Sequence, residues 1–519
     1  MTARLQSSVP PPAEVVARLV GDAVASRIAE CDPTLWPRAA RPGWVAAPRA
    51  SRPLVGEIEG LRERLRVAGQ VRVVLAAAGG VGVAAEVLAG ADPRLIVLDT
   101  TDPAQVADAL AGDLGATVLV VSAPPGEDAR PVELVRDIVH RAFRADGLDP
   151  AAHTVIVTAP DGPLQEQADG ATVVLGPADV DGPWAGLTAF ALVPAGLAGA
   201  DVGAVLADAA AARAELVIDD PANPCLALGA LLADAPVVAL AEDGTPGLAE
   251  WAAQLVGGGL GKNGHGPLPV VVEGPDAPEW ADPDSLRPGS LTAGLGDVPG
   301  AAVATLGPPA AQLVLWQHAT AVAAHLLGVD PTDRPDAARA AVDLPGTAGP
   351  HSAPIATSLG TADFTDGGVD VHAGPWLPAG TSTVAAALRA LIGTADEGSH
   401  LTVHAYLDRL DDASAAVLRP ELARRTGLPT TFGWAPRCLP GGGQRDKGGP
   451  ADAVVCQLTG APPDLPEALA ELQQAAELQQ AQARADAAAL AHRGLPVLRL
   501  HFSDRVAGLV TLARAVQQL

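Results

Sequence analysis

From Val71 onward the chain repeats one pattern: a short run of β-branched and other apolar residues, a turn, and then an amphipathic stretch rich in alanine and leucine. This succession is typical of parallel strands joined by crossover helices. Right-handed β-α-β connections would place the strands in one layer with helices on both faces. The first strands are predicted at 71–76, 95–99, 117–122 and 154–158.

A second set of strand-like runs begins near Pro236. Its members are residues 236–240, 268–273, 301–306, 401–407, 430–434, 453–458 and 496–502. Residues 10–65 are predicted to form helices interrupted by prolines, and 467–492 a long helix before the final strand. The stretches 275–300 and 345–375 are rich in proline and glycine, so we expect surface loops there.

These patterns predict an α/β protein, and a chain of 519 residues with 48% hydrophobic content can bury cores of the required size. We expect a helical amino-terminal segment and two α/β domains, followed by a helix and a final strand and helix packed on them. The predicted boundaries are 1–65, 66–205, 206–462 and 463–519.

The chain is acidic, with a formal net charge of -26. Such a charge argues against nucleic acid or an anionic membrane surface as a partner. The amino terminus lacks a signal-type apolar core and no apolar run is long enough to span a bilayer, so a cytoplasmic location is expected. Four scattered cysteines indicate neither a disulfide framework nor a metal site, and no cofactor is expected. They are Cys31, Cys225, Cys438 and Cys456.

Only two of the 34 basic residues are lysines, and both lie in glycine-rich segments. Lys262 follows Gly257-Gly258-Gly259-Leu260-Gly261, and Lys447 precedes Gly448-Gly449. Glycine lets the backbone approach a ligand closely, and lysine supplies a compact charge. The two segments are therefore candidate loops for an anionic small molecule, with flexible surface turns as the alternative.

The turns that follow strands are the expected ligand-binding places in an open α/β sheet. Gly79-Gly80 follows the first strand, and the backbone amides of a glycine pair at a helix start can hold an anion. The turn from Ser122 to Asp128 instead contains two prolines and two carboxylates. Glu127 and Asp128 would cap the next helix themselves and repel a phosphate.

Four longer segments resemble glucose-6-phosphate isomerase, in the actinobacterial type related to the isomerase half of transaldolase-isomerase fusions. They are 186–201, 315–331, Trp251 to Lys262 and Phe432 to Pro450, and the match runs in order from about Val71 to Leu500. The resemblance implies two sugar-isomerase (SIS) domains, each a parallel sheet sandwiched by helices. It also implies a dimer with the active site between domains and subunits.

The functional residues of that family are largely replaced here. In place of its phosphate loop, S-K-S-G-T-T, this chain keeps only Ser122 and Gly126. Pro183 stands where an arginine would stabilise the enediolate, and Gly258 where a glutamate would act as the general base. A general base is worth about 10²- to 10⁴-fold in rate, and glycine has no group that can titrate.

The carboxy-terminal motif of the family is also altered. The places of its two histidines, which assist ring opening, are taken by Pro440 and Asp446. Arg437, Gln444 and Lys447 match the family. No catalytic residue is thus intact, and the remaining candidates for ligand binding are Gly79, Gly80, Ser122, Gly126, Lys262, Arg437, Gln444 and Lys447.

We interpret the chain as an inactive homologue that acts as a binding or assembly partner in sugar-phosphate metabolism. One alternative is an active isomerase with relocated residues, such as Asp446 or Glu250 as a base, or one acting on an unphosphorylated sugar. Another is a SIS-type sensor of sugar phosphates. A homodimer, or a heterodimer with an active isomerase paralogue, is expected because 315–327 and 469–490 keep many apolar residues. A sugar or sugar phosphate is the expected ligand.

Overall fold

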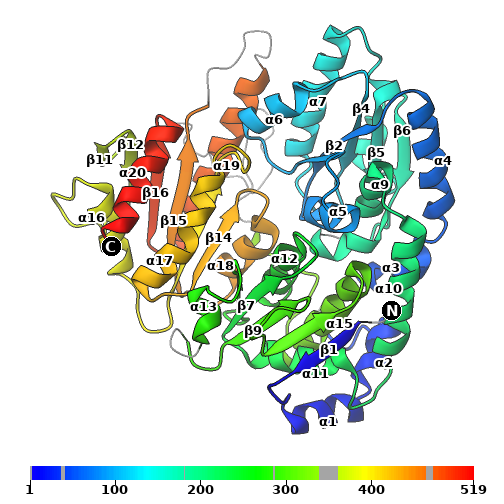
Figure 1. The fold of residues 1–519 in the computed structure, drawn as a ribbon, viewed down its shortest axis with the longest axis horizontal. Helices are drawn as coiled ribbons and strands as arrows, with labels where there is room; N and C mark the ends of the chain where they lie inside the picture. Colours follow the sequence, from blue (N-terminus) through cyan, green and yellow to red (C-terminus); the bar gives the residue numbers. More distant parts are fainter. Residues whose placement is uncertain (1–2, 37–40, 181, 284–286, 338–360, 463–470) are drawn as a thin grey trace.

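The computed structural model describes residues 3–36, 41–180, 182–283, 287–337, 361–462 and 471–519. Three sheets with helices packed around them make up the fold (Figure 1). Most neighbouring strands are parallel, and the α/β class with parallel-rich sheets flanked by helices is therefore confirmed.

The first sheet is entirely parallel and has the order β3-β2-β4-β5-β6. Its central strands are continuous apolar runs because helices cover both faces. The strands are β2 (Arg72–Ala77), β3 (Leu95–Leu98), β4 (Thr117–Ser122), β5 (Thr154–Thr158) and β6 (Thr172–Leu175). The helices along this part of the chain are α5 (Val81–Ala89), α6 (Pro103–Leu110), α7 (Arg130–Ala145), α8 (Pro163–Glu166) and α9 (Ala189–Ala198). All four predicted strands are confirmed, and β6 is an addition.

The second sheet has the order β1-β10-β9-β7-β8, with β1 antiparallel to β10. Its strands are β1 (Arg4–Ser7), β7 (Val237–Glu242), β8 (Leu268–Val271), β9 (Leu291–Leu295) and β10 (Val303–Leu306). The prediction of a surface loop over 275–300 is wrong for β9, which is buried between β7 and β10. Its five residues are too few to show a period, and flanking glycines obscured them. The sequence pattern does not predict β1 either.

The third sheet has the order β11-β12-β16-β15-β13-β14. Its strands are β11 (Phe364–Asp366), β12 (Val369–His372), β13 (His400–Tyr406), β14 (Thr430–Trp434), β15 (Ala453–Gly460) and β16 (Val497–Phe502). The hairpin β11-β12 occupies part of the predicted loop 345–375, of which 345–360 lie outside the described residues. Gly367 and Gly368 make its two-residue turn with φ of 56° and 81°, a conformation that favours glycine. The strands expected between 236 and 502 are thus divided between two sheets.

The remaining helices connect and cover the sheets. They are α1 (Ala13–Gly21), α2 (Val24–Ala29), α3 (Gly43–Ala50), α4 (Leu54–Val67), α10 (Val202–Leu216), α11 (Pro224–Asp234), α12 (Leu248–Leu260), α13 (Pro278–Ala281), α15 (Pro309–Leu327), α16 (Val384–Ile392), α17 (Arg419–Thr426), α18 (Gln444–Gly448), α19 (Glu471–His492) and α20 (Arg505–Gln517). Short 3₁₀ or π turns are η1 (Ala151–His153), η2 (Gly182–Leu187), η4 (Ala413–Leu418) and η5 (Leu439–Gly443). None of the helices in the described ranges is both long and apolar enough to cross a membrane.

Helix α15 is apolar on all sides because it lies inside the protein, packed against α10, α11 and α12. The apolar residues that suggested a partner protein are therefore covered within the chain itself. Leu315 is buried in α15, and Leu472, Leu478 and Leu490 are buried in α19, while Leu469 lies outside the described residues. This removes one reason for expecting a dimer, and association stays a prediction based on the family resemblance.

Candidate functional site

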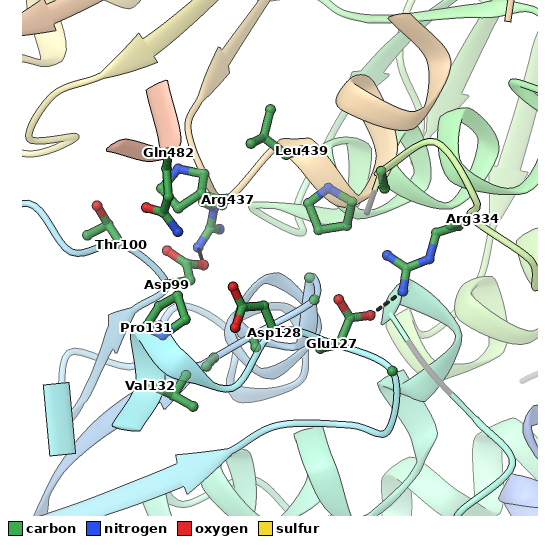
Figure 2. Close-up of a pocket in the computed structure, with 18 of the residues that line it drawn as sticks. Asp99, Thr100, Glu127, Asp128, Pro131, Val132, Arg334, Arg437, Leu439 and Gln482 are labelled. Carbon is green, nitrogen blue, oxygen red and sulfur yellow. Dashed lines mark hydrogen bonds and ion pairs between the residues drawn. The ribbon is translucent and has the colours of Figure 1, made fainter. Parts of the chain in front are cut away.

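A cavity of about 750 Å³ opens at the carboxyl ends of β2, β3 and β4. We call it the main cavity. In the first sheet β2 lies between β3 and β4. The chain runs from β2 to β3 on one side, and from β4 to β5 on the other side. Ligands of open α/β sheets bind at such a switch point. The other walls come from residues 332–337, from 436–440 after β14, and from Gln482 of α19 (Figure 2).

The glycine pair after β2 lies in this wall, although the side chain of Glu127 covers part of it. Gly79 and Gly80 have φ of 71° and 83°, and a Cβ on Gly79 would lie 2.6 Å from Cγ of Glu127. A side chain at position 79 is thus excluded both by the backbone conformation and by the close approach of Glu127. Gly79 thus makes room for Glu127, whereas a Cβ on Gly80 would lie 2.5 Å from Oε1 of Gln254.

The two carboxylates of the β4-α7 turn have different roles. Glu127 forms an ion pair with Arg334, and both side chains are largely buried (Figure 2). Asp128 turns towards α7, where its Oδ1 accepts a hydrogen bond from the backbone amide of Arg130 over 3.1 Å. Asp128 therefore bonds the first residue of α7, although the N-cap position itself is Ala129, and both carboxylates line the main cavity.

Arg437 holds three carboxylates together in the wall opposite Glu127. Its Nη1 donates to Oδ2 of Asp99 over 2.5 Å and its Nε to Oε1 of Glu250 over 2.7 Å, and Nη2 contacts Glu86. Arg409 donates to the other oxygen of Glu86 over 2.8 Å. Arg437, kept from the family motif, is thus surrounded by acidic groups.

The pKa of Asp99 and the pKa of Glu86 are shifted in opposite directions. Burial raises the pKa of Asp99, and its neighbours Glu86 and Glu250 raise it further, although Arg437 and Arg409 oppose the change. Burial also raises the pKa of Glu86, but Arg437 and Arg409 outweigh it and lower the pKa overall. Asp99 is therefore a carboxyl group in the lining of the main cavity whose pKa is raised.

The two family positions for transition-state chemistry supply no reactive group. A Cβ on Gly258 of α12 would lie 2.8 Å from the carbonyl oxygen of Pro440, so backbone closes that position. Pro183 is buried in η2, where its carbonyl accepts a hydrogen bond from Nε1 of Trp251 over 3.1 Å. Both positions are filled by packing.

Asp446 and Lys447 lie in a buried chain of charges that does not line the main cavity. Asp446 lies 3.5 Å from Nε2 of His400 and 3.3 Å from Nε2 of His404. Nδ1 of His404 is 3.3 Å from Asp486, which also pairs with Lys447. Burial would lower the pKa of His404, but Asp446 and Asp486 outweigh it and raise the pKa to about 9. In this buried series of side chains, the carboxylates of Asp446 and Asp486 alternate with His404 and Lys447.

Three other predicted ligand-binding residues bond to the protein itself. Nζ of Lys262 lies 2.5 Å from the carbonyl oxygen of Asp330, and Ser122 donates to the carbonyl of Phe190 over 2.8 Å. Gln444 donates to the carbonyl of Gly261 over 2.9 Å. Lys262 thus bonds backbone carbonyls and Lys447 pairs with Asp486, and an anion at either lysine loop stays a prediction.

Gly79, Gly80, Gly126, Arg437 and Pro440 are the predicted residues that line the main cavity. The sequence pattern did not point to several other lining groups. Asp99 at the end of a predicted strand could have been noticed, whereas three residues come from segments remote in sequence and carry no local signal. These are Arg41, Arg334 and Gln482.

Comparison with models of known protein families gives no match. Curated relatives share part of the chain. A probable glucose-6-phosphate isomerase from Natronomonas pharaonis is 36% identical over 194 residues, which are 34% of this chain and 44% of the relative. A probable glucose-6-phosphate isomerase from Haloarcula marismortui is 30% identical over 40% of this chain and 51% of its own length. The glucose-6-phosphate isomerase of Synechococcus sp. is 37% identical over 24% of this chain and 25% of its own length. The chain thus spans about half or less of these relatives.

Solved structures show the same fold. A hypothetical protein from Thermus thermophilus has a TM-score of 0.53 at 22% identity, covering 64% of this chain and 96% of its own. A glucose-6-phosphate isomerase from Chlamydia trachomatis has a TM-score of 0.52 at 16% identity, covering 64% and 85%. The resemblance of this chain to the glucose-6-phosphate isomerase family is therefore confirmed, over the part of its length that these matches cover.

Proposed function

We propose that the chain is a sugar-binding relative of the glucose-6-phosphate isomerases that has lost their proton-transfer reaction. The observation that carries this proposal is the state of the main cavity. The volume of the cavity lies within the range of small-molecule sites. Position 258, by contrast, is a glycine without a titratable group, and the backbone of Pro440 leaves no room for a side chain on it.

The charges of the main cavity favour a neutral polyhydroxylated ligand over a sugar phosphate. Its lining has three arginines and four carboxylates: Arg41, Arg334, Arg437, Asp99, Glu127, Asp128 and Asp333. Arg334 pairs with Glu127, and Arg437 with Asp99. A dianionic phosphate would have to compete with these carboxylates for the same arginines. Charges a few ångströms apart interact by about 4 kcal/mol at an effective dielectric of 20.

Titration calorimetry with glucose, fructose and their 6-phosphates tests the proposal. We expect glucose or fructose to bind at least about tenfold more tightly than its phosphate, which is about 1.4 kcal/mol. A coupled assay should show no interconversion of glucose 6-phosphate and fructose 6-phosphate at rates typical of enzymes, about 1 to 10³ s⁻¹. Tighter binding of the phosphates would refute the neutral ligand, and turnover would refute the loss of reaction.

An aldose-ketose isomerase with relocated residues is the second candidate, and Asp99 favours it. Its carboxyl group lines the main cavity, and burial raises its pKa towards the range in which it can exchange a proton. If the assay finds turnover of a neutral sugar, Asp99→Asn should remove it. The exposed, remote Asp276→Asn is the matched control, and it should leave turnover unchanged.

A further inference from the structure

A second cavity, of about 670 Å³, lies away from the main cavity, on the third sheet. It is bounded by α19, by the turn from α19 into β16, and by residues 372–376 after β12. Strands β12 and β16 are antiparallel neighbours, and their register places His372 opposite Arg499. The cavity thus lies between residues that follow β12, near the start of this sheet in the sequence, and residues of α19 and β16, near its end.

The charge of the second cavity has the opposite sign to that of the chain. Arg484 of α19, Arg499 of β16 and His372 are in its lining, and no carboxylate is among the described residues that line it. Asp363 and Asp370 act on His372 but do not line the cavity. In a protein with a net charge of -26, a cavity whose described lining residues include two arginines and no carboxylate differs from the rest of the surface.

The two guanidinium groups influence one another. Burial lowers the pKa of Arg484, and burial followed by the charge of Arg484 lowers the pKa of Arg499. Nε of Arg484 is buried and has no hydrogen-bond partner in the part of the chain that the structure describes. A buried donor without a partner is costly, and a bound anion would accept a hydrogen bond from Nε of Arg484.

Most of the remaining lining residues are apolar, and Thr394 is the polar exception among the described ones. Ala487, Ala488 and Ala491 follow Arg484 by three, four and seven positions, so they share one face of α19 with it. Their small side chains leave room above the helix. Trp376 faces the same cavity, and a Cβ on Gly374 would lie 3.1 Å from its indole nitrogen. An indole next to arginines suits a ligand with a flat or apolar part.

We propose that the second cavity binds a small organic oxyanion, with its phosphate or carboxylate on Arg484 and Arg499 and its apolar part along Trp376 and the alanines. Arginine matches both oxyanions because its planar fork can donate two parallel hydrogen bonds. This site is separate from the main cavity and independent of the ligand proposed there.

Titration calorimetry of the full chain with phenyl phosphate, benzoate and inorganic phosphate tests the site. We expect one equivalent of phenyl phosphate or benzoate to bind more tightly than inorganic phosphate, and binding to weaken with salt. Arg484→Gln should weaken binding at least about tenfold, because it removes a charge-assisted pair. Trp376→Leu should weaken the aromatic ligands and leave inorganic phosphate unchanged. The affinity for phenyl phosphate compared with the affinity for benzoate shows whether the site prefers a phosphate or a carboxylate.

Controls locate the binding. Arg514→Gln, on the exposed surface of α20, should have no effect, and Arg334→Gln should retain binding because it alters only the main cavity. Arg484→Lys keeps the positive charge but lacks the planar guanidinium group, so it should bind with an intermediate affinity. This variant still tests the site if Arg484→Gln does not fold. The proposal is overturned if none of the three probes binds at millimolar concentration. It is equally overturned if Arg484→Gln or Arg484→Lys binds as the unaltered protein does.

Discussion

Arg437 and Asp99 are joined in the wall of the main cavity: Nη1 of the arginine donates to Oδ2 of the aspartate over 2.5 Å, and both side chains are almost fully buried. The same guanidinium binds Glu250 and Glu86. Arg437, which the family resemblance implied as a ligand-binding residue, is therefore the centre of a cluster in which carboxylates outnumber arginines.

Replacing Arg437 by Gln should lower the free energy of unfolding by about 3 to 5 kcal/mol, since it leaves buried carboxylates without their cation. Urea denaturation measures the change. Arg52→Gln, at an exposed position, is the control and should change stability little. Adding Asp99→Asn to Arg437→Gln should recover part of the loss, and a double variant no more stable than the single one would contradict the role of the pair.

The charge chain around His404 predicts a stability that depends on pH. The pKa of His404 is raised from 6.5 to about 9, so its contribution is full below pH 6.5 and is lost as the pH rises through 9. Burial would raise the pKa of Asp486, but Lys447 and His404 outweigh it and lower the pKa from 3.8 to about 2. That contribution is present above pH 3.8 and is lost as the pH falls towards 2.

Melting temperatures between pH 6 and 10 test this prediction. The unaltered protein should lose stability between about pH 6.5 and pH 9, and His404→Gln should flatten that loss. His492→Gln, at an exposed position at the end of α19, should keep the original profile. An identical alkaline profile for His404→Gln and the unaltered protein would show that His404 does not carry a proton in the folded state.

Restoring a glutamate at position 258 should not restore isomerase activity. A Cβ there would lie 2.8 Å from the carbonyl oxygen of Pro440, so Gly258→Glu should destabilise the protein by about 1 to 3 kcal/mol. Gly56→Glu places the same side chain on an exposed helix position with no atom within 4 Å, and its stability should be close to that of the unaltered protein. Turnover by Gly258→Glu would mean that the proton-transfer site is still assembled.

Neutralising Glu127 should change the preference of the main cavity for charge. Glu127→Gln removes the carboxylate that pairs with Arg334, so glucose 6-phosphate should bind about tenfold more tightly, and glucose should bind as before. Calorimetry measures both affinities, with Asp276→Asn as the control. An unchanged phosphate affinity would show that Glu127 does not limit the choice of ligand.

The family resemblance leads us to expect a homodimer, or a heterodimer with an active isomerase paralogue. Obligate interfaces usually bury more than about 2,000 Å², so the complex should persist at micromolar concentration. Light scattering checks the mass of the chain alone and after the paralogue is added. A monomer under both conditions would remove the expectation.

The sequence by itself determined the fold class and the elements of the first sheet. Its strands are apolar runs between turns. Each strand can be recognised from its own few residues, without knowledge of the rest of the chain. The conformation that glycine permits is also a local property, so the pattern of residues was enough to single out Gly79 and Gly80, which line the main cavity. The strand β9 was missed because a short buried strand without alternation resembles a loop in a region rich in glycine.

Only the tertiary structure decided which charges meet. Glu127 and Arg334 are 207 positions apart, and Arg437 and Asp99 are 338 apart, so no local pattern relates them. The same holds for Lys447, whose loop looked suited to an anion until α19 placed Asp486 beside it. A charged side chain takes the partner that packing brings within reach, because burial makes an unpaired charge too costly. Sequence can therefore nominate a charged residue, while its partner, and with it the chemistry of the cavity, depends on the fold.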